Sequence, residues 1–312
     1  MPPTSSTRKP VVLVTSIAGR FGRLLARALH GSHEVLGLDL RGDHHMPKDV
    51  RVFPLDLRRK KAEDVFRRER IDAVVHLPAE GMPGESMQEH RSRTVLGTRK
   101  VLSYCHEYDI PKLVIVSTAA LYGANPDNPQ FLSEEAPLLA GRDSPLLRDL
   151  VEADMTTNSF FWQHPEVDTV LLRPVHMVGR LSNPASRYLR LSAVPTVMGF
   201  DPMVQVVSPE DVSRATLLAL KPGIRGVFNI AGPSPAPLSR IIERCGRRAL
   251  PLPEVALRAM LGLALGIGRK GIGAAELTYL KYVCMVDDSR ARDVLGYRPL
   301  RTLDQTLIQL RA

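Results

Sequence analysis

The segment "LVTSIAGRFGRLLARALH", residues 13–30, combines an apolar run, a glycine-bearing turn and a helical pattern. Apolar residues lead into a turn that holds Gly19 and Gly22, and apolar residues then recur at helical spacing. A strand, a glycine-bearing turn and a helix in this order can hold a phosphate group, because the backbone N–H groups at the start of the helix converge there. Ser16 stands where a glycine is expected, and serine costs about 1 kcal/mol if φ has to be positive at that position.

Apolar, β-rich segments alternate with helical patterns through the first half of the chain. They lie at residues 10–15, 34–40, 50–56, 73–77, 112–118 and 168–174. Continuous apolar strands separated by helices are typical of a parallel sheet that helices cover on both faces. The sequence therefore predicts an α/β fold, a doubly wound parallel Rossmann-type sheet with a smaller C-terminal substrate lobe.

The chain divides into three predicted segments. Residues 1–9 are polar and are expected to form a flexible tail, residues 10–174 a dinucleotide-binding domain, and residues 175–312 a substrate-binding lobe. We expect the lobe to be partly interleaved with the first domain, because "QVVSPEDV" at 205–212 and "GVFNIAG" at 226–232 are expected to return to its edge.

Composition limits the classes to which the protein can belong. Cys105, Cys245 and Cys284 lack the spacing of metal ligands, so neither a disulfide framework nor a metal site is predicted, and a cytoplasmic location is expected. The net charge of +9 favours contact with phosphates. Because the arginines are spread along the chain without a nucleic-acid-binding motif, no nucleic-acid partner is predicted.

No stretch reaches the ~20 uninterrupted apolar residues that span a bilayer. The nearest candidate is "EVALRAMLGLALGIG", residues 254–268, which contains Glu254 and Arg258. We favour a buried helix in the substrate lobe, and peripheral contact with a membrane is the alternative. Association into a homodimer is compatible with the sequence.

An acidic residue follows the turn at the distance that dinucleotide-binding sites use. Asp39 ends the second predicted strand, about twenty residues after Gly19, where its carboxylate can accept hydrogen bonds from ribose hydroxyls. An ordinary tight turn with an incidental aspartate is the alternative. Asp39 favours NAD over NADP because its charge would repel a 2′-phosphate, although Arg20 or Arg41 could reach that phosphate.

The order of motifs along the chain resembles that of the extended short-chain dehydrogenase/reductases, and among them the NAD-dependent epimerase/dehydratase family. The family's "TGxxGxxG" corresponds to "TSIAGRFG" at 15–22, and its "VVHLAA" to "VVHLPA" at 74–79. Later motifs of the family resemble "TVLGT" at 94–98, "VIVSTAALYG" at 114–123 and "LLRPVHMVG" at 171–179. The resemblance covers almost the whole chain and implies the same Rossmann-type fold.

This resemblance implies a site for NAD, with NADP as the second choice. Asp56 corresponds to the family's aspartate that meets the adenine, and Thr94 replaces the asparagine of "NVxGT". The expected cofactor-binding residues are Ser16, Gly19, Arg20, Phe21, Gly22, Asp39, Asp56, Leu57, Leu77, Pro78, Ala79, Thr94 and Arg148.

The chain departs from the family at its catalytic positions. The family uses a tyrosine as acid or base, a lysine four residues later that lowers the tyrosine pKa, and a serine or threonine that hydrogen-bonds the reacting oxygen. Alignment on Glu152 places Ser144 at the tyrosine position and Arg148 at the lysine position. Serine is a much weaker acid, and arginine stays protonated. We favour the interpretation in which Ser144, followed by Pro145, is a helix N-cap.

Other side chains are candidates for the missing chemistry. Thr118 can fill the role of the hydroxyl residue, or it can bond local backbone at the end of its strand. Tyr122 is a nearby phenol that would act only if the loop after it folded it inward, and Arg148 can bind ribose or phosphate. Asp143 and His176 are further titratable residues near the expected cleft.

Two classes of function remain open. One is an oxidoreductase or epimerase that acts on a nucleotide sugar or a related hydroxyl-bearing substrate with a rearranged proton relay. The other is a degenerate cofactor-binding sensor that regulates a partner. Arg180, Arg187 and Arg190 could clamp a diphosphate or form a solvated basic face, whereas residues 254–268 suggest a lipid-linked ligand. We expect the enzyme, because a proton relay is moved more readily than a binding cleft is rebuilt.

Overall fold

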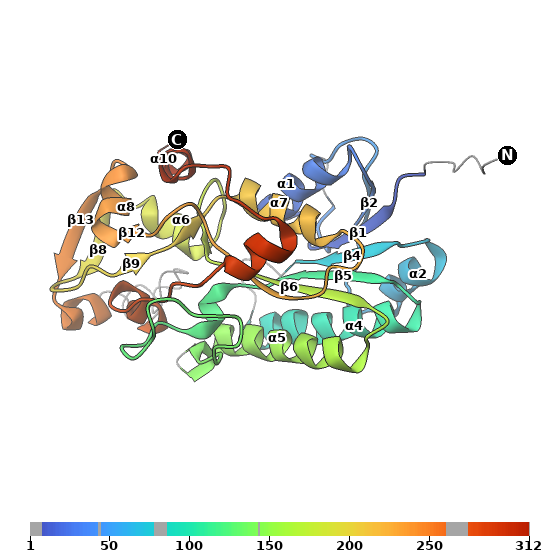
Figure 1. Ribbon diagram of the computed structural model, residues 1–312, viewed down its shortest axis with the longest axis horizontal. Helices are drawn as coiled ribbons and strands as arrows, with labels where there is room; N and C mark the ends of the chain where they lie inside the picture. Colours follow the sequence, from blue (N-terminus) through green and yellow to red (C-terminus); the bar gives the residue numbers. More distant parts are fainter. Residues whose placement is uncertain (1–7, 43–44, 78–85, 143, 260–273, 312) are drawn as a thin grey trace.

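A seven-stranded sheet forms the centre of the molecule in the computed structural model, which describes residues 8–42, 45–77, 86–142, 144–259 and 274–311 (Figure 1). The strand order is β3-β2-β1-β4-β5-β6-β11, and every neighbouring pair is parallel. The strands are β1 (Val11–Thr15), β2 (Glu34–Leu38), β3 (Arg51–Phe53), β4 (Ala73–His76), β5 (Lys112–Val116), β6 (Asp168–Pro174) and β11 (Gly226–Ile230). The predicted doubly wound Rossmann-type sheet is confirmed.

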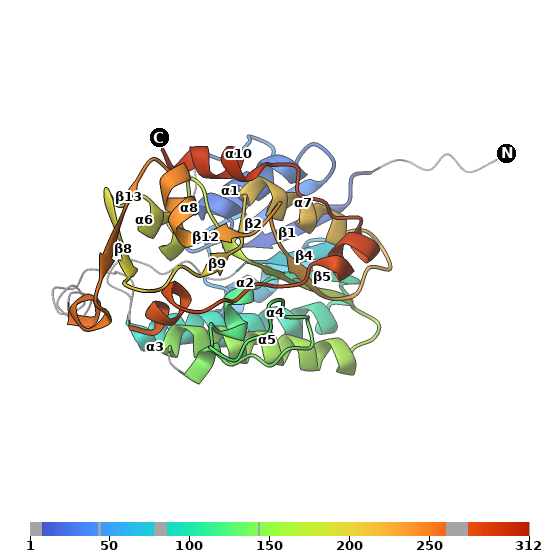
Figure 2. The ribbon, with the colours of Figure 1, turned by 60° about the vertical axis from the view of Figure 1, so that its left-hand side comes forward.

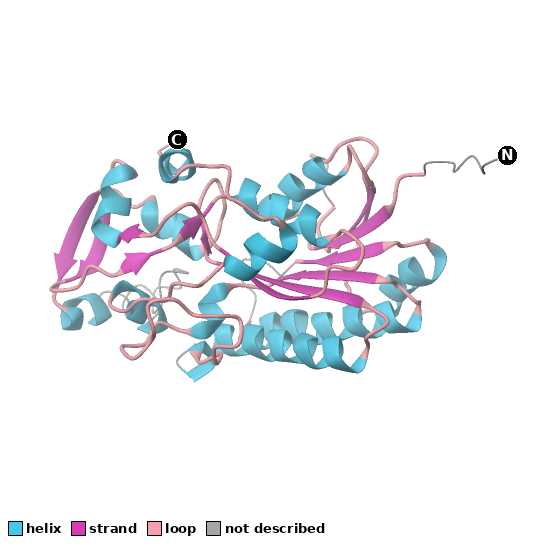
Figure 3. Cartoon of the chain, in the orientation of Figure 1, coloured by secondary structure: helices cyan, strands magenta, loops and turns pink. Residues whose placement is uncertain are grey.

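Helices cover both faces of this sheet (Figure 3). They are α1 (Arg20–Leu29), α2 (Lys60–Arg68), α3 (Met87–Arg91), α4 (Gly97–Glu107), α5 (Pro145–Gln163) and α7 (Pro209–Ala219), with short helical turns at η1 (Ser92–Leu96), η2 (Ala119–Tyr122) and η3 (Ala140–Arg142). Apolar side chains of α1 and α7 pack with one set of strand residues, and those of α2, α4 and α5 pack with the other set. Because both faces are buried, all five residues of β1 and of β5 are buried as well.

Four predicted strands end earlier than their apolar pattern suggested. The segments 73–77 and 112–118 end at residues 76 and 116. The segment 50–56 forms only β3, because Pro54 has no N–H to donate to a ladder. The segment 34–40 ends at Leu38; the N–H of Asp39 still donates to the Phe53 carbonyl at 3.2 Å, and its carboxylate accepts a hydrogen bond from the N–H of Ala18 in the first turn.

A smaller group of elements lies at one end of the sheet (Figure 2). It contains β7 (His176–Met177), α6 (Pro184–Leu189), β8 (Ala193–Val197), β9 (Met203–Val204), β10 (Val206–Val207), β12 (Ala236–Pro237), α8 (Leu238–Arg244), β13 (Arg248–Leu252), η4 (Ala274–Leu280), α10 (Leu303–Leu307) and η6 (Ile308–Leu310). The short strands pair as β7 with β10, β9 with β12, and β8 with β13. Its own core includes Val194, Ile241 and Leu307.

Three later elements belong to the large sheet unit by their contacts. β11 pairs with β6 along its whole length, and α7 packs against α1. The helical turn η5 (Ala291–Leu295) packs against α7 and β11. Of the expected tail, residues 1–7 lie outside the described residues. In the apolar segment 254–268, residues 260–268 also lie outside them, and of residues 254–259 only Leu257 is buried. None of the described helices is long and apolar enough to cross a membrane.

Candidate functional site

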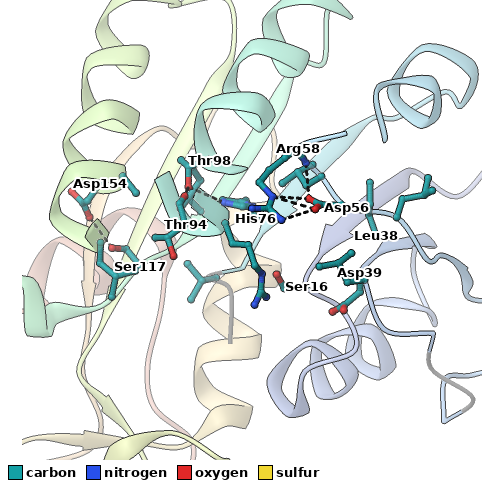
Figure 4. A pocket seen from close by; sticks show the side chains of 18 residues that line it. Ser16, Leu38, Asp39, Asp56, Arg58, His76, Thr94, Thr98, Ser117 and Asp154 are labelled. Atoms are coloured by element: carbon teal, nitrogen blue, oxygen red, sulfur yellow. Dashed lines mark hydrogen bonds and ion pairs between the residues drawn. The ribbon is translucent and has the colours of Figure 1, made fainter. Parts of the chain in front are cut away.

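A cleft with about 750 Å³ of empty space, its open mouth included, lies at the carboxyl ends of the central strands (Figure 4). It spans the gap between β1 and β4, where the order of the strands reverses and where doubly wound sheets bind ligands. The lining residues are Ser16, Leu38, Asp39, Leu40, Leu55, Asp56, Leu57, Arg58, His76, Arg93, Thr94, Thr98, Ile115, Val116, Ser117, Leu150, Ala153 and Asp154.

The first turn builds one wall of the cleft. Ser16 has φ of 53°, the left-handed region that glycine adopts without strain, and its N–H donates to the Leu38 carbonyl at 2.8 Å. A Cβ on Gly22 would lie 2.4 Å from the carbonyl oxygen of Ile17, so only glycine fits there. Gly19 is the N-cap of α1 and has no side chain to accept from the first-turn N–H groups, which suits them to an anion.

Asp39 lies at the end of β2 with its side chain almost fully buried. Its carboxylate accepts from the N–H of Ala18 at 3.0 Å and from the Nε of Arg41 at 3.1 Å. The guanidinium of Arg41 therefore pairs with the very carboxylate that is expected to meet the ribose. The other arginine considered for a 2′-phosphate, Arg20, donates to the carbonyl of Arg180 at 3.0 Å, across to the smaller group of elements.

Asp56 and Arg58 form an ion pair at the outer side of the cleft, with Nη2 and Oδ2 2.6 Å apart. Hydrogen bonds from Arg58 hold the pKa of the Asp56 carboxyl below its ordinary value. The same guanidinium donates to Glu89 at 2.7 Å and to Ser92 at 2.8 Å. Because Leu57 also lines this side, the cleft here has an apolar surface beside an ordered charged pair.

His76 lies at the deep side of the cleft and is held by two threonines. Its Nδ1 is 2.7 Å from Oγ1 of Thr15, and its Nε2 is 3.0 Å from Oγ1 of Thr98. Burial lowers the pKa of His76 to about 4, so the imidazole is neutral near pH 7. The neighbouring hydroxyl of Thr94 is buried, and among the described residues it has no hydrogen-bond partner.

Ser117 and Asp154 line the inner end of the cleft. The hydroxyl of Ser117 donates to Asp154 at 2.8 Å, and the same carboxylate receives Arg173 at 2.6 Å. His76 and Asp154 are not among the site residues that the sequence predicts. Their signal was a polar residue in an apolar strand or on the buried face of a helix, a pattern that also fits ordinary core residues.

Five of the expected cofactor residues, Ser16, Asp39, Asp56, Leu57 and Thr94, come together in this cleft. The remaining ones lie elsewhere: the side chains of Phe21 and Leu77 are buried in the core, and Gly19 and Gly22 shape the first turn. Pro78 and Ala79 lie outside the described residues, as does Asp143.

The three expected catalytic residues, Thr118, Tyr122 and Arg148, are not among the residues that line the cleft. The hydroxyl of Thr118 accepts from the N–H of Ala120 at 3.2 Å, so it bonds local backbone. Arg148 is exposed, and its Nε donates to the carbonyl of Gly141 at 3.2 Å. Its role in the site stays a prediction.

Tyr122 is buried among polar side chains away from the cleft. Its hydroxyl donates to Asn229 at 2.8 Å and accepts from Arg173 at 3.0 Å. Burial raises the pKa of Tyr122 to about 12, which keeps the phenol protonated. This placement argues against the predicted role of Tyr122 in proton transfer.

Ser144 is the N-cap of α5, as the sequence indicated. Its hydroxyl accepts from the N–H of Leu147 at 3.3 Å, and Pro145 occupies the first turn. The helix-cap interpretation of Ser144 is therefore confirmed.

One phenol and one imidazole come together near the Thr118 turn. The hydroxyl of Tyr279 donates to the carbonyl of Ala120 at 2.5 Å, and its ring lies edge-on to that of His176 with centroids 5.8 Å apart. Tyr279 and Leu147 of α5 also line one small hollow. Because Tyr279 lies 159 residues from Ala120 along the chain, only the tertiary structure brings it here.

Comparisons with solved structures agree with this architecture. A UDP-glucose 4-epimerase from Thermotoga maritima, solved with UDP-glucose, superimposes with a TM-score of 0.73 over 96% of this chain and 97% of its own, at 21% identity. A UDP-glucuronic acid 4-epimerase from Bacillus cereus, solved in complex with NAD, gives a TM-score of 0.70 at 20% identity, over 95% and 96% of the two chains. At these identities the likeness establishes the fold.

Sequence relatives and a family model place the chain more closely. An uncharacterized protein of Mycobacterium tuberculosis is 26% identical over 248 residues, which is 78% of this chain and 66% of the relative. A UDP-glucose 4-epimerase of Halalkalibacterium halodurans is 34% identical over 119 residues, 36% of each protein. The model of the NAD dependent epimerase/dehydratase family matches residues 12–231, more than half of the chain and all of the cleft. The chain therefore belongs to the NAD-dependent epimerase/dehydratase family.

Proposed function

We propose that the protein binds NAD in the cleft and acts as an oxidoreductase or epimerase on a nucleotide sugar or a related hydroxyl-bearing substrate. The observation that carries the cofactor assignment is the buried hydroxyl of Thr94, which faces the cleft without a partner among the described residues (Figure 4). A buried hydroxyl without a hydrogen bond is costly, so a ligand that bonds it gains affinity. When bound, NAD would supply the hydride acceptor and donor.

Several other features of the cleft suit a dinucleotide. The uncapped start of α1 suits a pyrophosphate, Asp39 suits ribose hydroxyls, and Leu57 offers an apolar surface beside Asp56. The carboxylate of Asp39 opposes a 2′-phosphate, which supports NAD over NADP. The pairing of Arg41 with Asp39 supports the same choice, because that guanidinium already has an anionic partner.

An anionic substrate is supported by positive charge near the start of α1. Arg20 reaches the carbonyl of Arg180, and burial together with the charge of Arg20 lowers the pKa of Arg190. A phosphate bound between two such guanidinium groups would offset the repulsion between their positive charges. Some similar proteins are named UDP-glucose 4-epimerases, and the structure from Thermotoga maritima was solved with UDP-glucose, which supports a nucleotide sugar as the substrate.

For acid–base chemistry we propose Tyr279, with His176 beside it. Tyr279 is half-buried, lies at the turn that follows Thr118 and shares a hollow with the first turn of α5. This is the end of the helix at which the family carries its tyrosine and lysine. The phenol of Tyr279, from the smaller lobe, would then take the role of the family's tyrosine, whose position Ser144 occupies in this chain.

The second candidate is a cofactor-binding regulatory protein without chemistry. The hydrogen bonds of Ser144 and Arg148 favour this candidate, because both side chains have structural partners. Ser144 caps α5, and Arg148 donates to the Gly141 carbonyl. A sensor would keep the cleft and would not need either residue for catalysis.

Calorimetry with NAD and NADP tests the cofactor assignment. Thr94→Val is isosteric and removes the hydroxyl, so NAD affinity should fall about 5- to 10-fold. Thr216→Val is the matched control, because that buried hydroxyl bonds the Val212 carbonyl on α7, away from the cleft. Asp39→Ala should weaken binding of NAD more than binding of NADP. The absence of binding of both cofactors at millimolar concentration would refute the assignment.

Turnover distinguishes the two candidates. The protein is incubated with NAD and a panel of nucleotide sugars, polyprenyl-linked sugars and hydroxysteroid-like lipids, and both products and bound NADH are followed. We expect turnover of a nucleotide sugar that falls at least 100-fold in Tyr279→Phe and stays unchanged in Tyr108→Phe, a control phenol bonded to Glu63. NAD binding without turnover of any panel member would favour the sensor.

A further inference from the structure

Two imidazoles and one carboxylate converge at the edge of the sheet opposite the cleft. His106 lies in the last turn of α4, His164 is the C-cap of α5, and Glu166 precedes β6. One candidate metal-binding atom from each of the three residues lies within 4.8 Å of the others. Because β6 begins at Asp168, the group lies at the amino ends of the strands, whereas the cleft lies at their carboxyl ends.

The distances within the group are close to those of a metal site. The Nδ1 atoms of His106 and His164 lie 3.2 Å and 2.9 Å from the same atom, Oε1 of Glu166. Tetrahedral zinc holds nitrogen and oxygen ligands at about 2.0–2.2 Å, which separates neighbouring ligand atoms by about 3.3 Å. The two Nδ1–Oε1 separations therefore need to grow by only a few tenths of an ångström to admit an ion.

The surroundings hold the two rings in place. The ring of His164 lies between those of Phe160 and His106, with centroid distances of 4.5 Å and 4.1 Å. The side chain of His164 is 24% exposed, and those of His106 and Glu166 are 56% and 54% exposed. Ions can therefore reach the three residues from solvent while the central ring keeps its orientation.

The local electrostatics favour a cation. The group lies at the C-terminal ends of α4 and α5, where the carbonyl ends of helices carry partial negative charge. Oε1 of Glu166 faces both imidazoles, so the group offers a carboxylate oxygen beside its two nitrogens. Neutral imidazoles with a carboxylate are ligands that zinc and similar transition-metal ions prefer over Mg²⁺ or Ca²⁺.

We propose that His106, His164 and Glu166 bind one divalent transition-metal ion of the zinc class. The ion would take the place of the two hydrogen bonds to Oε1 and would join the ends of α4 and α5 to the start of β6. A fourth ligand position stays open to water. The three residues lie outside the nucleotide cleft, so this proposal does not depend on the proposed function and is tested separately from it.

Titration calorimetry with Zn²⁺ tests this site, on protein that carries no histidine tag and has been stripped with a chelator. We expect one Zn²⁺ per chain, with affinity that falls at least 10-fold in His106→Ala, His164→Ala and Glu166→Gln. Binding that stays unchanged in His106→Ala and His164→Ala would overturn the proposal, and so would the absence of any binding at micromolar Zn²⁺.

Two control variants account for other ligands on the chain. His30→Ala removes an exposed histidine paired with Asp49 at 3.4 Å, and Cys284→Ser removes a thiol that is only partly buried. Both should bind Zn²⁺ as the wild type does; loss of the stoichiometric ion in either would contradict the assignment. Far-UV circular dichroism of the metal-free variants checks that they fold.

Cobalt provides a second readout. Co²⁺ bound at a four-coordinate site absorbs visible light more strongly than hydrated Co²⁺, so the wild type should develop this absorption and His164→Ala should not. Zn²⁺ should also raise the melting temperature of the wild type and leave that of His164→Ala unchanged, because an ion stabilises only the state that binds it. Equal effects on both proteins would overturn the proposal.

Discussion

Ser16 adopts the backbone conformation that its motif normally assigns to glycine. Its φ of 53° lies in the left-handed region, which disfavours residues that carry a Cβ. The hydrogen bond from its N–H to Leu38 and the one from Gly19 to its carbonyl keep it there. The turn is therefore intact, and the serine lowers its stability without changing its shape.

Ser16→Gly should raise the free energy of unfolding by about 0.5–1 kcal/mol, because glycine adopts positive φ without the Cβ penalty. Urea denaturation measures the change. Ser16→Ala is the control, since it removes the hydroxyl and keeps the Cβ, and it should bring no such gain. Equal stabilisation by both substitutions would show that the hydroxyl, and not the backbone, is the cause.

The buried imidazole of His76 in the cleft makes the free energy of unfolding depend on pH. Its pKa is about 4 in the folded protein because burial disfavours the imidazolium, and it is about 6.5 in an unfolded chain. Between these values the unfolded state binds more protons, so the free energy of unfolding falls as the pH drops through this window. The loss attributable to His76 is at most about 3–4 kcal/mol.

Denaturation curves at about pH 7 and about pH 4.5 check this dependence. The difference between the two should be smaller in His76→Asn than in the wild type, because asparagine does not titrate. His30→Asn, at an exposed position, should keep the wild-type difference. An unchanged pH dependence in His76→Asn would contradict the assignment.

At the scale of one element, α5 shows how a local sequence signal was decisive. Serine followed by proline indicated a helix start, and the structure has Ser144 as N-cap and Pro145 in the first turn. The same helix turns Asp154 toward the sheet, although helical spacing alone did not distinguish that aspartate from a solvent-exposed one.

Ser144→Ala should lower the free energy of unfolding by about 1 kcal/mol, since the N–H of Leu147 loses its acceptor. Ser144→Asp should restore the loss, because aspartate is an equally good N-cap. NAD affinity should stay unchanged in both variants. A collapse of turnover in Ser144→Ala with no loss of stability would instead identify Ser144 as a catalytic residue.

At the scale of the whole molecule, a buried polar network joins the sheet to the elements around it. Arg173 of β6 pairs with Asp154 of α5 and donates to Tyr122 and to the carbonyl of Glu134. Asn229 of β11 accepts from Tyr122 and donates to the carbonyl of Asp287. The side chains of Arg173 and Asp154 are 5% and 1% exposed, so each charge depends on the other.

Asp154→Ala should destabilise the protein by about 3–5 kcal/mol, because it leaves the Arg173 guanidinium buried without its counter-ion. The double variant Asp154→Leu with Arg173→Met should lose less, since no buried charge remains. Urea denaturation of both variants and of the wild type makes the comparison. If the double variant has the lower free energy of unfolding, the cost of an unpaired buried charge does not account for the contribution of the ion pair to stability.

The parallel sheet, the glycine-bearing first turn and the family could all be predicted from the amino-acid sequence alone. The spacing of apolar residues, the turn residues and the order of motifs can be read directly along the chain. Strands β1, β4 and β6 could therefore be predicted, and so could the cleft positions Ser16, Asp39, Asp56 and Thr94. The end of β3 could not, because its apolar run continues past Pro54, which has no N–H to donate to the ladder.

Only the tertiary structure decided which distant side chains meet. His106 and Glu166 are separated by a helix and a strand, and Tyr279 comes from the last part of the chain, yet each lies beside partners that no sequence spacing indicates. The same holds for the burial of Tyr122, which the sequence offered only as a nearby phenol that would act if the loop after it folded it inward. The physical reason is that a side chain's chemistry depends on burial and on neighbours, and packing of the whole chain sets both.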